Sequence, residues 1–146
     1  MIKCTFEDDK GASLRHVIVD TLVLTGNKLL LVKRAKKLTE GGKWGLAGGF
    51  LDRDEYLIDA VRREVLEETG WKVKDVNLLE VVDNPKRGNE DRQNVAFVYT
   101  CQAVKKVGKG DDESEDQQWF RLNKLPPADK IAFDHLEMIR FYLKNK

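Results

Sequence analysis

Cysteine is scarce in this chain, and long apolar runs and any excess of charge of one sign are missing. The 146 residues include two cysteines, Cys4 and Cys101, which are too few and too far apart for a disulfide framework or a metal-binding spacing. No apolar run approaches the roughly 20 residues that a transmembrane helix needs. The 26 basic and 25 acidic residues leave a net charge of +1, which excludes a global basic surface for nucleic acid.

The remaining composition is that of an ordinary globular domain. Hydrophobic residues make up 41% of the chain, enough for a core. The first residues, MIKCTFEDDKG, are acidic and lack the apolar centre of a signal peptide. No internal repeat or low-complexity linker divides the sequence. We therefore expect one domain over residues 1–146, reduced cysteines and a cytoplasmic protein with no membrane or nucleic-acid partner.

Strand and helix patterns follow one another in an order typical of an α+β fold. β-Branched residues over 16–25, a Gly-Asn turn and an apolar run over 28–34 predict a hairpin. Apolar residues recur every four positions within 55–69, and Gly70 follows as a helix stop. The other segments predict a loop with one short strand at 36–50, strands at 71–83, 93–104 and 117–122, and a helix at 131–143. We expect a mixed sheet between the two helices.

Three glutamates gather on one side of the first predicted helix. At about 100° per residue, Glu64, Glu67 and Glu68 fall within a sector of about 100°. Val61 and Val65 flank this sector on the side toward the core. Like charges at this spacing repel, and a hard divalent cation would remove the conflict. The alternative is a solvated helix face, because charge runs usually serve solubility.

The residues around this helix decide between the two interpretations. Five residues separate Gly49 from Glu55, and seven more separate Glu55 from the run REVLEETGW at 63–71. The pattern resembles the Nudix box, Gly-x5-Glu-x7-Arg-Glu-U-x-Glu-Glu-x-Gly-U with U a bulky apolar residue, and every fixed position matches. Trp71 stands where relatives more often have Ile, Leu or Val. Ala47 stands before the glycines where many relatives have Pro.

The resemblance extends over most of residues 14–145 and implies a Nudix-type α/β/α sandwich. Such a fold has a central mixed sheet, a catalytic loop-helix-loop and a C-terminal helix. The resemblance also implies a bound cation, Mg²⁺ or Mn²⁺. Its expected ligands are the carboxylates of Glu64, Glu67, Glu68 and Glu113 and the carbonyl oxygen of Gly48.

Two further box residues are expected to support these ligands. Arg63 and Glu55 resemble groups that orient the metal-binding carboxylates, although a surface ion pair is the alternative. Hydrolysis also needs a carboxylate that removes a proton from water, and relatives differ in which one does so. The candidates are Glu64, Glu67 and Glu113. Glu113 lies in an acidic loop six residues before Trp119, a spacing at which relatives often have an acid. Glu115 and Asp116 are alternatives in the same loop.

Residues outside the box bear on the substrate. Pro85, fifteen residues after Gly70, and the stretch IAFDH at 131–135 resemble features of the ADP-ribose pyrophosphatase branch. A plain turn is the alternative for Pro85. Arg87 and Arg92 are candidate contacts to phosphate or ribose, and solvated loop charge is their alternative.

Aromatic residues are candidates for stacking on a base. They are Trp44, Phe50 and Tyr99, although single aromatics more often belong to a core. His135 could act as a base, but one histidine near a helix start more often caps or packs.

The resemblance implies a Mg²⁺-dependent pyrophosphohydrolase that cleaves a nucleoside diphosphate linked to a further group X. ADP-ribose or a related nucleoside diphosphate sugar is the expected small-molecule substrate. One alternative is a MutT-like housecleaning enzyme for oxidised nucleoside triphosphates. Another is a silent ADP-ribose-binding module, in which the box is usually damaged or a DNA-binding domain is appended. Relatives of the ADP-ribose branch are often homodimers, and apolar N-terminal strands could supply that contact.

Overall fold

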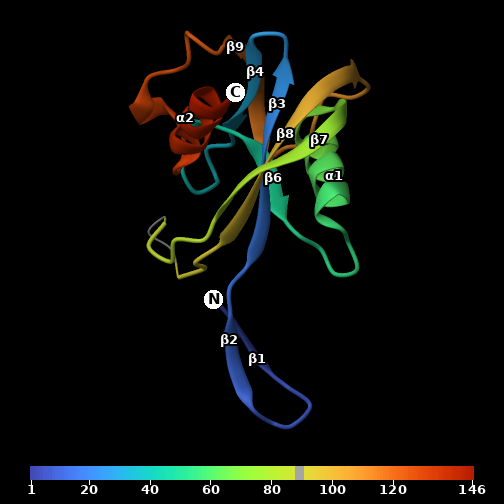
Figure 1. Ribbon diagram of the computed structural model, residues 1–146, viewed down its shortest axis with the longest axis vertical. Helices are drawn as coiled ribbons and strands as arrows, with labels where there is room; N and C mark the ends of the chain where they lie inside the picture. The colour runs from blue at the N-terminus through green and yellow to red at the C-terminus, as the bar shows by residue number, and fades with distance from the viewer. Residues whose placement is uncertain (88–90) are drawn as a thin grey trace.

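The computed structural model describes residues 1–87 and 91–146. A mixed sheet lies between two helices, which cover its opposite faces (Figure 1). The strands are β1 (Ile2–Thr5), β2 (Gly11–Leu14), β3 (Val17–Thr25), β4 (Lys28–Arg34), β5 (Trp44–Gly45), β6 (Ala47–Phe50), β7 (Trp71–Val82), β8 (Val95–Lys106) and β9 (Ser114–Arg121). The helices are α1 (Leu57–Thr69), α2 (His135–Asn145) and a short 3-10 turn at Ala128–Lys130. The expected α+β sandwich is confirmed.

The central strand β3 organises the sheet. The strand order is β5-β4-β3-β8-β7, with β6 also paired to β3 and β9 to β4. β3 and β8 run parallel, whereas the other pairs are antiparallel, so the sheet is mixed. Residues 23–25 of β3 pair with β4, and residues 18–21 pair with β6. β4 and β6 therefore share one edge of β3 and diverge from each other.

Two apolar cores lie on the two faces of the sheet. Alternation along β3 sends Leu22 toward α2, where Met138 and Ile139 are buried, and sends Val23 toward the other face. On that second face, Val61 and Val65 of α1 are completely buried, as the helical periodicity predicts. Gly70 ends α1 in a left-handed conformation (φ 71°), and its N–H donates to the Leu66 carbonyl oxygen at 2.8 Å.

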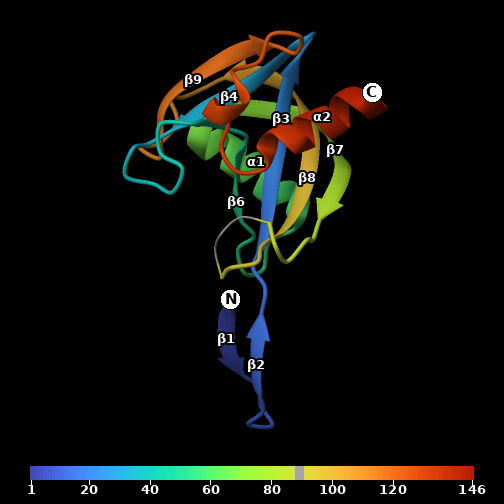
Figure 2. The same cartoon turned by 90° about the vertical axis from the view of Figure 1, so that its left-hand side faces the viewer.

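The N-terminal strands form a hairpin that projects away from the rest of the molecule (Figure 2). Three of its large apolar side chains are exposed: Ile2, Phe6 and Leu14. Across the described residues, no helix combines the length and the apolar character needed to traverse a bilayer.

The C-terminal helix begins later than the sequence pattern predicts. Residues 131–134 are not helical, and α2 starts at His135 rather than at 131. Ile131 is extended and forms a parallel bridge with Trp44, and the Ala132 N–H donates to the Trp44 carbonyl oxygen at 2.7 Å. This pairing to a distant strand replaces the first helical turn. The segment 36–50 likewise contains two short strands, β5 and β6, where one was expected.

Candidate functional site

A cleft of about 1030 Å³ opens beside the edge of β3 where β4 and β6 diverge. Many segments of the chain line it, among them three groups of residues that are far apart in the sequence. Gly48, Gly49 and the α1 glutamates come from the box. Asp111 and Glu113 come from the acidic loop, and residues 133–137 come from the segment that enters α2.

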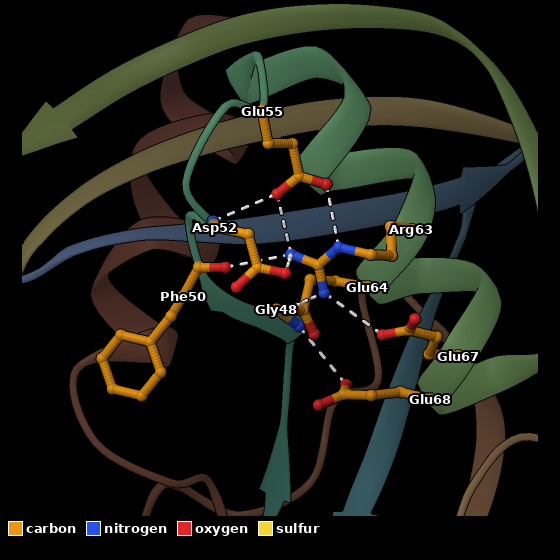
Figure 3. A network of polar contacts seen from close by, with 8 residues as sticks. All are labelled: Gly48, Phe50, Asp52, Glu55, Arg63, Glu64, Glu67 and Glu68. Carbon is orange, nitrogen blue, oxygen red and sulfur yellow. Dashed lines mark hydrogen bonds and ion pairs between the residues drawn. The ribbon is translucent and has the colours of Figure 1, made fainter.

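Arg63 is the centre of a polar network behind this cleft (Figure 3). Its Nε and one Nη group bind both oxygens of Glu55, at 2.8 and 2.9 Å, and the same Nη donates to the Phe50 carbonyl oxygen at 3.0 Å. Its other Nη donates to Glu64 at 2.7 Å and to Glu67 at 3.2 Å. All five N–H groups of the guanidinium are thus used. These bonds, above all those to Glu55, raise the pKa of Arg63 further above its usual range.

Glu55 fastens the loop before α1 to the helix. Its carboxylate binds Arg63 on one side and accepts the Asp52 N–H at 3.2 Å on the other. The hydrogen bond from Arg63 lowers the pKa of Glu55, so this carboxylate remains charged. Neither Arg63 nor Glu55 lines the cleft. Both lie behind the glutamates that do.

The three α1 glutamates differ in burial. Glu68 is 6% exposed and the Glu64 side chain 13%, whereas the Glu67 side chain is 51% exposed. Burial raises the pKa of Glu64, and burial together with the charge of Glu64 raises the pKa of Glu68 well above 4.5. A solvated face would not bury two carboxylates side by side, so that alternative does not describe Glu64 and Glu68.

Glycine at 48 and 49 makes room for this arrangement. A Cβ at position 49 would come within 2.5 Å of Glu64 Oε1, and a Cβ at position 48 would come within 2.0 Å of the Val19 carbonyl oxygen. The Gly48 N–H also donates to Glu68 Oε2 at 3.3 Å. The absence of a side chain at position 49 therefore lets β6 approach Glu64 of α1, and its absence at position 48 lets β6 lie against β3.

The donor set fits a hard divalent cation. Within residues 1–87 and 91–146, no three acidic, histidine or cysteine side chains already converge on one point. The hydrogen bonds to Glu64, Glu67 and Glu68 nevertheless occupy one oxygen of each carboxylate and leave the other for a ligand. Burial, with a smaller contribution from neighbouring carboxylates, raises the pKa of Glu64 and Glu68, and a cation bound there would stabilise their charged forms.

The acidic loop is fixed against the end of α1. The Val107 N–H donates to the Gly70 carbonyl oxygen at 2.7 Å, and a Cβ at Gly110 would come within 2.2 Å of the Glu68 carbonyl oxygen. Farther along, the Glu113 carbonyl oxygen accepts the Ala35 N–H at 2.8 Å. These backbone contacts hold the loop beside the carboxylates of the box.

Of the three acids considered in this loop, the structure brings Glu113 to the cleft. Glu115 instead accepts the Lys36 N–H at 3.0 Å, and Asp116 accepts the N–H of its neighbour Gln117. Asp111 also lines the cleft, although the six-residue spacing before Trp119 points to Glu113 and not to Asp111.

A buried polar cluster forms another wall. Arg87 binds both oxygens of Asp134 at 2.8 Å and lies 3.6 Å from Asp20 Oδ2. His135 is 4% exposed, accepts the Leu46 N–H at Nδ1 (2.9 Å) and places Nε2 at 3.6 Å from Asp20 Oδ1. Burial lowers the pKa of His135, so a neutral ring with its proton on Nε2 fits both contacts. Arg87 therefore faces the cleft with its charge already compensated.

The aromatic candidates divide between cleft and core. Phe50 lines the cleft, and the Arg92 guanidinium lies 5.8 Å from its ring centroid. Trp44 instead packs edge-to-face on Phe120 in the core beside α2, and Tyr99 is 6% exposed in the core beside α1. Pro85, which is exposed, does not line the cleft either. The structure does not bring Trp44, Tyr99 or Pro85 to the site.

Several cleft residues escape the sequence patterns, among them Asp20, Arg34, Asp111 and Phe133. Asp20 had a signal, since it is a lone acid within an apolar strand. Phe133 lies in the stretch IAFDH, which suggested a branch of the family but no role for this ring.

Known proteins resemble this chain along most of its length. The sequence model of the NUDIX domain matches residues 14–142. An ADP-ribose pyrophosphatase of Methanocaldococcus jannaschii is 35% identical over 130 residues, which cover 89% of this chain and 74% of that protein. A MutT-like protein of Streptomyces ambofaciens is 34% identical over 74% of this chain and 64% of its own length.

Solved structures agree with these sequence matches. The NUDIX domain of Shewanella oneidensis NrtR, in complex with ADP ribose, superposes with a TM-score of 0.75 at 27% identity, over 92% of this chain and 90% of that one. A NUDIX hydrolase from Nitrosomonas europaea superposes with a TM-score of 0.71 at 23% identity, over 91% of both chains, and shares the fold. With an intact box, a buried carboxylate pair and these matches, the chain belongs to the Nudix hydrolase family.

Proposed function

We propose that the protein is a divalent-cation-dependent pyrophosphohydrolase whose substrate is ADP-ribose or a related nucleoside diphosphate sugar. The observation that carries the proposal is the buried pair Glu64 and Glu68 in a cleft of about 1030 Å³, a size suited to a small ligand. The archaeal relative, named an ADP-ribose pyrophosphatase, and the NrtR domain bound to ADP ribose support this choice of substrate.

Five groups would hold Mg²⁺ or Mn²⁺: the carboxylates of Glu64, Glu67, Glu68 and Glu113 and the carbonyl oxygen of Gly48. A cation bound there supplies neutralisation of the pyrophosphate charge and a coordinated water of lowered pKa. Arg63 holds the carboxylates of Glu64 and Glu67 in fixed directions, and Glu55 holds Arg63. Both are positioning residues, since neither lines the cleft.

Glu64, Glu67 and Glu113 are the candidate bases that take the proton of the attacking water, since all three line the cleft. The pH dependence of kcat/KM in Glu64→Gln, Glu67→Gln and Glu113→Gln separates them, because the acidic limb of the profile disappears only in the variant that lacks the base.

The proposal is tested by a substrate panel with Mg²⁺. We expect ADP-ribose to give AMP and ribose 5-phosphate. A housecleaning enzyme would instead convert an oxidised nucleoside triphosphate into a monophosphate and pyrophosphate, a function that the similarity to the MutT-like protein favours. Absence of turnover with every nucleotide would contradict the proposal and leave a silent binding module.

The N-terminal hairpin supports a further proposal, a homodimer. An isolated two-stranded hairpin is marginally stable in water, and the exposed Ile2, Phe6 and Leu14 would be covered by a second copy. Light scattering should give twice the chain mass for the wild type and the mass of a monomer when all three residues are serine. A monomeric wild type would refute the homodimer.

The unpaired cysteines, Cys4 and Cys101, are compatible with the cytoplasm as the compartment.

A further inference from the structure

Phe133 adopts a backbone conformation that large side chains rarely take. Its φ is 50°, in the left-handed region, where a bulky residue is strained. Six non-glycine residues in the described part of the chain have positive φ, and the other five are Asp, Glu or Gln. A short polar residue or glycine would fit this position with less strain, so local folding does not explain the phenylalanine.

The residues on either side of Phe133 are anchored by hydrogen bonds, whereas its own ring contacts the His135 ring at 5.3 Å between centroids. Ala132 is fully buried and donates its N–H to Trp44, and His135 is buried and accepts the Leu46 N–H. The left-handed turn between these anchors directs Phe133 outward, where it is 41% exposed and lines the cleft. A strained, exposed aromatic at a cleft wall indicates a binding role.

Arg34 lies over the face of this ring. Its guanidinium carbon lies 4.9 Å from the Phe133 ring centroid, and its Nε donates to the Thr39 carbonyl oxygen at 2.9 Å. Arg34 lines the same cleft as Glu68. A guanidinium held over an aromatic ring is itself a flat surface on which a nucleobase can stack, whichever base is present.

We propose that Phe133 and Arg34 form the subsite for the base of the nucleotide, an inference that rests on the proposed function. Phe50, the other exposed aromatic of the cleft, has similar neighbours, the His16 ring at 5.3 Å and the Arg92 guanidinium at 5.8 Å, but it lies in β6 without the strained backbone of Phe133. Trp44 and Tyr99 pack in the cores. Phe133 is therefore the aromatic side chain best placed to receive a base.

Steady-state kinetics with ADP-ribose test the subsite. Phe133→Leu keeps an apolar side chain without the ring, and we expect its KM to rise by about 5- to 150-fold with kcat close to that of the wild type. Phe133→Asn should show the same rise together with an equal or higher Tm, because asparagine tolerates the left-handed conformation. Phe141→Leu is the matched control, since Phe141 is 39% exposed and lies outside the cleft. A lower Tm and an unchanged KM for Phe133→Asn would show that the ring only packs, and would overturn the inference.

A binding measurement decides the question without turnover. Phe133→Trp places a fluorophore in the subsite, and its emission is compared with that of the wild type during titration with AMP and with ribose 5-phosphate. We expect saturable quenching by AMP alone. Equal responses to both compounds, or none to AMP, would overturn the base subsite. If the wild type hydrolyses no nucleotide, the proposed function fails, whereas the AMP titration still decides the inference.

Discussion

Gly49 lies against the carboxylate of Glu64, so closely that a Cβ at position 49 would be 2.5 Å from Oε1 and 2.7 Å from Oε2. At Gly48 the obstacle to a Cβ is instead the carbonyl oxygen of Val19 in the central strand, at 2.0 Å. A glutamate side chain can swing aside, but a backbone carbonyl within a sheet cannot. The two adjacent glycines therefore serve different purposes, one for the site and one for the fold.

Alanine substitutions should separate these purposes. We expect Gly49→Ala to fold with a nearly unchanged Tm and to lose about 10- to 100-fold in kcat/KM, because Glu64 is displaced. Gly48→Ala should lower the Tm markedly. Thermal unfolding and kinetics measure both effects, and Gly11→Ala is the control, since no atom lies within 4 Å of a Cβ there. Equal behaviour of the Gly48 and Gly49 variants would contradict this distinction.

Removing the charge of Glu68 should abolish metal binding. Glu68→Gln leaves the side chain nearly isosteric, and we expect turnover to fall by several orders of magnitude while the protein remains folded. Mg²⁺ or Mn²⁺ should raise the Tm of the wild type, because a ligand that binds only the native state stabilises it, and this shift should vanish in the variant. Near-normal activity of Glu68→Gln would refute the metal assignment.

The guanidinium of Arg63 cannot be replaced by an ammonium group. Lysine cannot reproduce the paired hydrogen bonds to Glu55 while also reaching Glu64, so Arg63→Lys should lower activity by about 10- to 100-fold and weaken metal affinity. Arg62→Lys is the control, because Arg62 makes only an exposed ion pair with Asp59 among the described residues. A metal titration of activity measures both variants, and the assignment fails if the two behave alike.

Acid should destabilise the protein through His135. Burial lowers its pKa below 6.5, and a protonated Nδ1 cannot accept the Leu46 N–H. A group whose pKa is lower in the folded state contributes stability above its unfolded pKa, and this contribution is lost as pH falls through the folded pKa. Nearby Asp20 and Asp134 favour protonation and Arg87 and Arg34 oppose it.

The variant His135→Asn tests this pH dependence. Asparagine does not titrate, so its Tm should be lower than that of the wild type at pH 7.5 but should fall less between about pH 7 and pH 5. His16→Asn is the matched control, because it removes the chain's other histidine. Identical slopes of Tm against pH for the wild type and His135→Asn would rule out this role.

Local periodicity predicted which glutamates of α1 lie at the edge of its buried face. The spacing of Val61 and Val65 placed α1 against the sheet, and the same geometry put Glu64 and Glu68 at the edge of the buried stripe. The different exposure of Glu67 and Glu68 could not be predicted in this way, because it depends on how closely β6 approaches the helix.

Non-local pairing explains what the sequence patterns missed. Trp44 and Phe133 are both single aromatics near glycine or polar residues, and nothing in their immediate neighbours separates them. Trp44 is placed in the core by Phe120, whereas Phe133 is turned outward by anchors on either side. The late start of α2 has the same origin, since Ile131 forms a parallel bridge with Trp44 instead of beginning the helix.

The bond from Leu46 N–H to His135 joins positions 89 residues apart, immediately before the strand that carries Gly48. Together with the hydrogen bond from the Ala132 N–H to the Trp44 carbonyl oxygen, it ties the C-terminal segment to the strands that lead into the box. The geometry of the box therefore depends on contacts outside residues 49–71. Transferred to another protein, these residues would keep their carboxylates but lose those contacts, so the motif alone would overestimate how many sequences are competent catalysts.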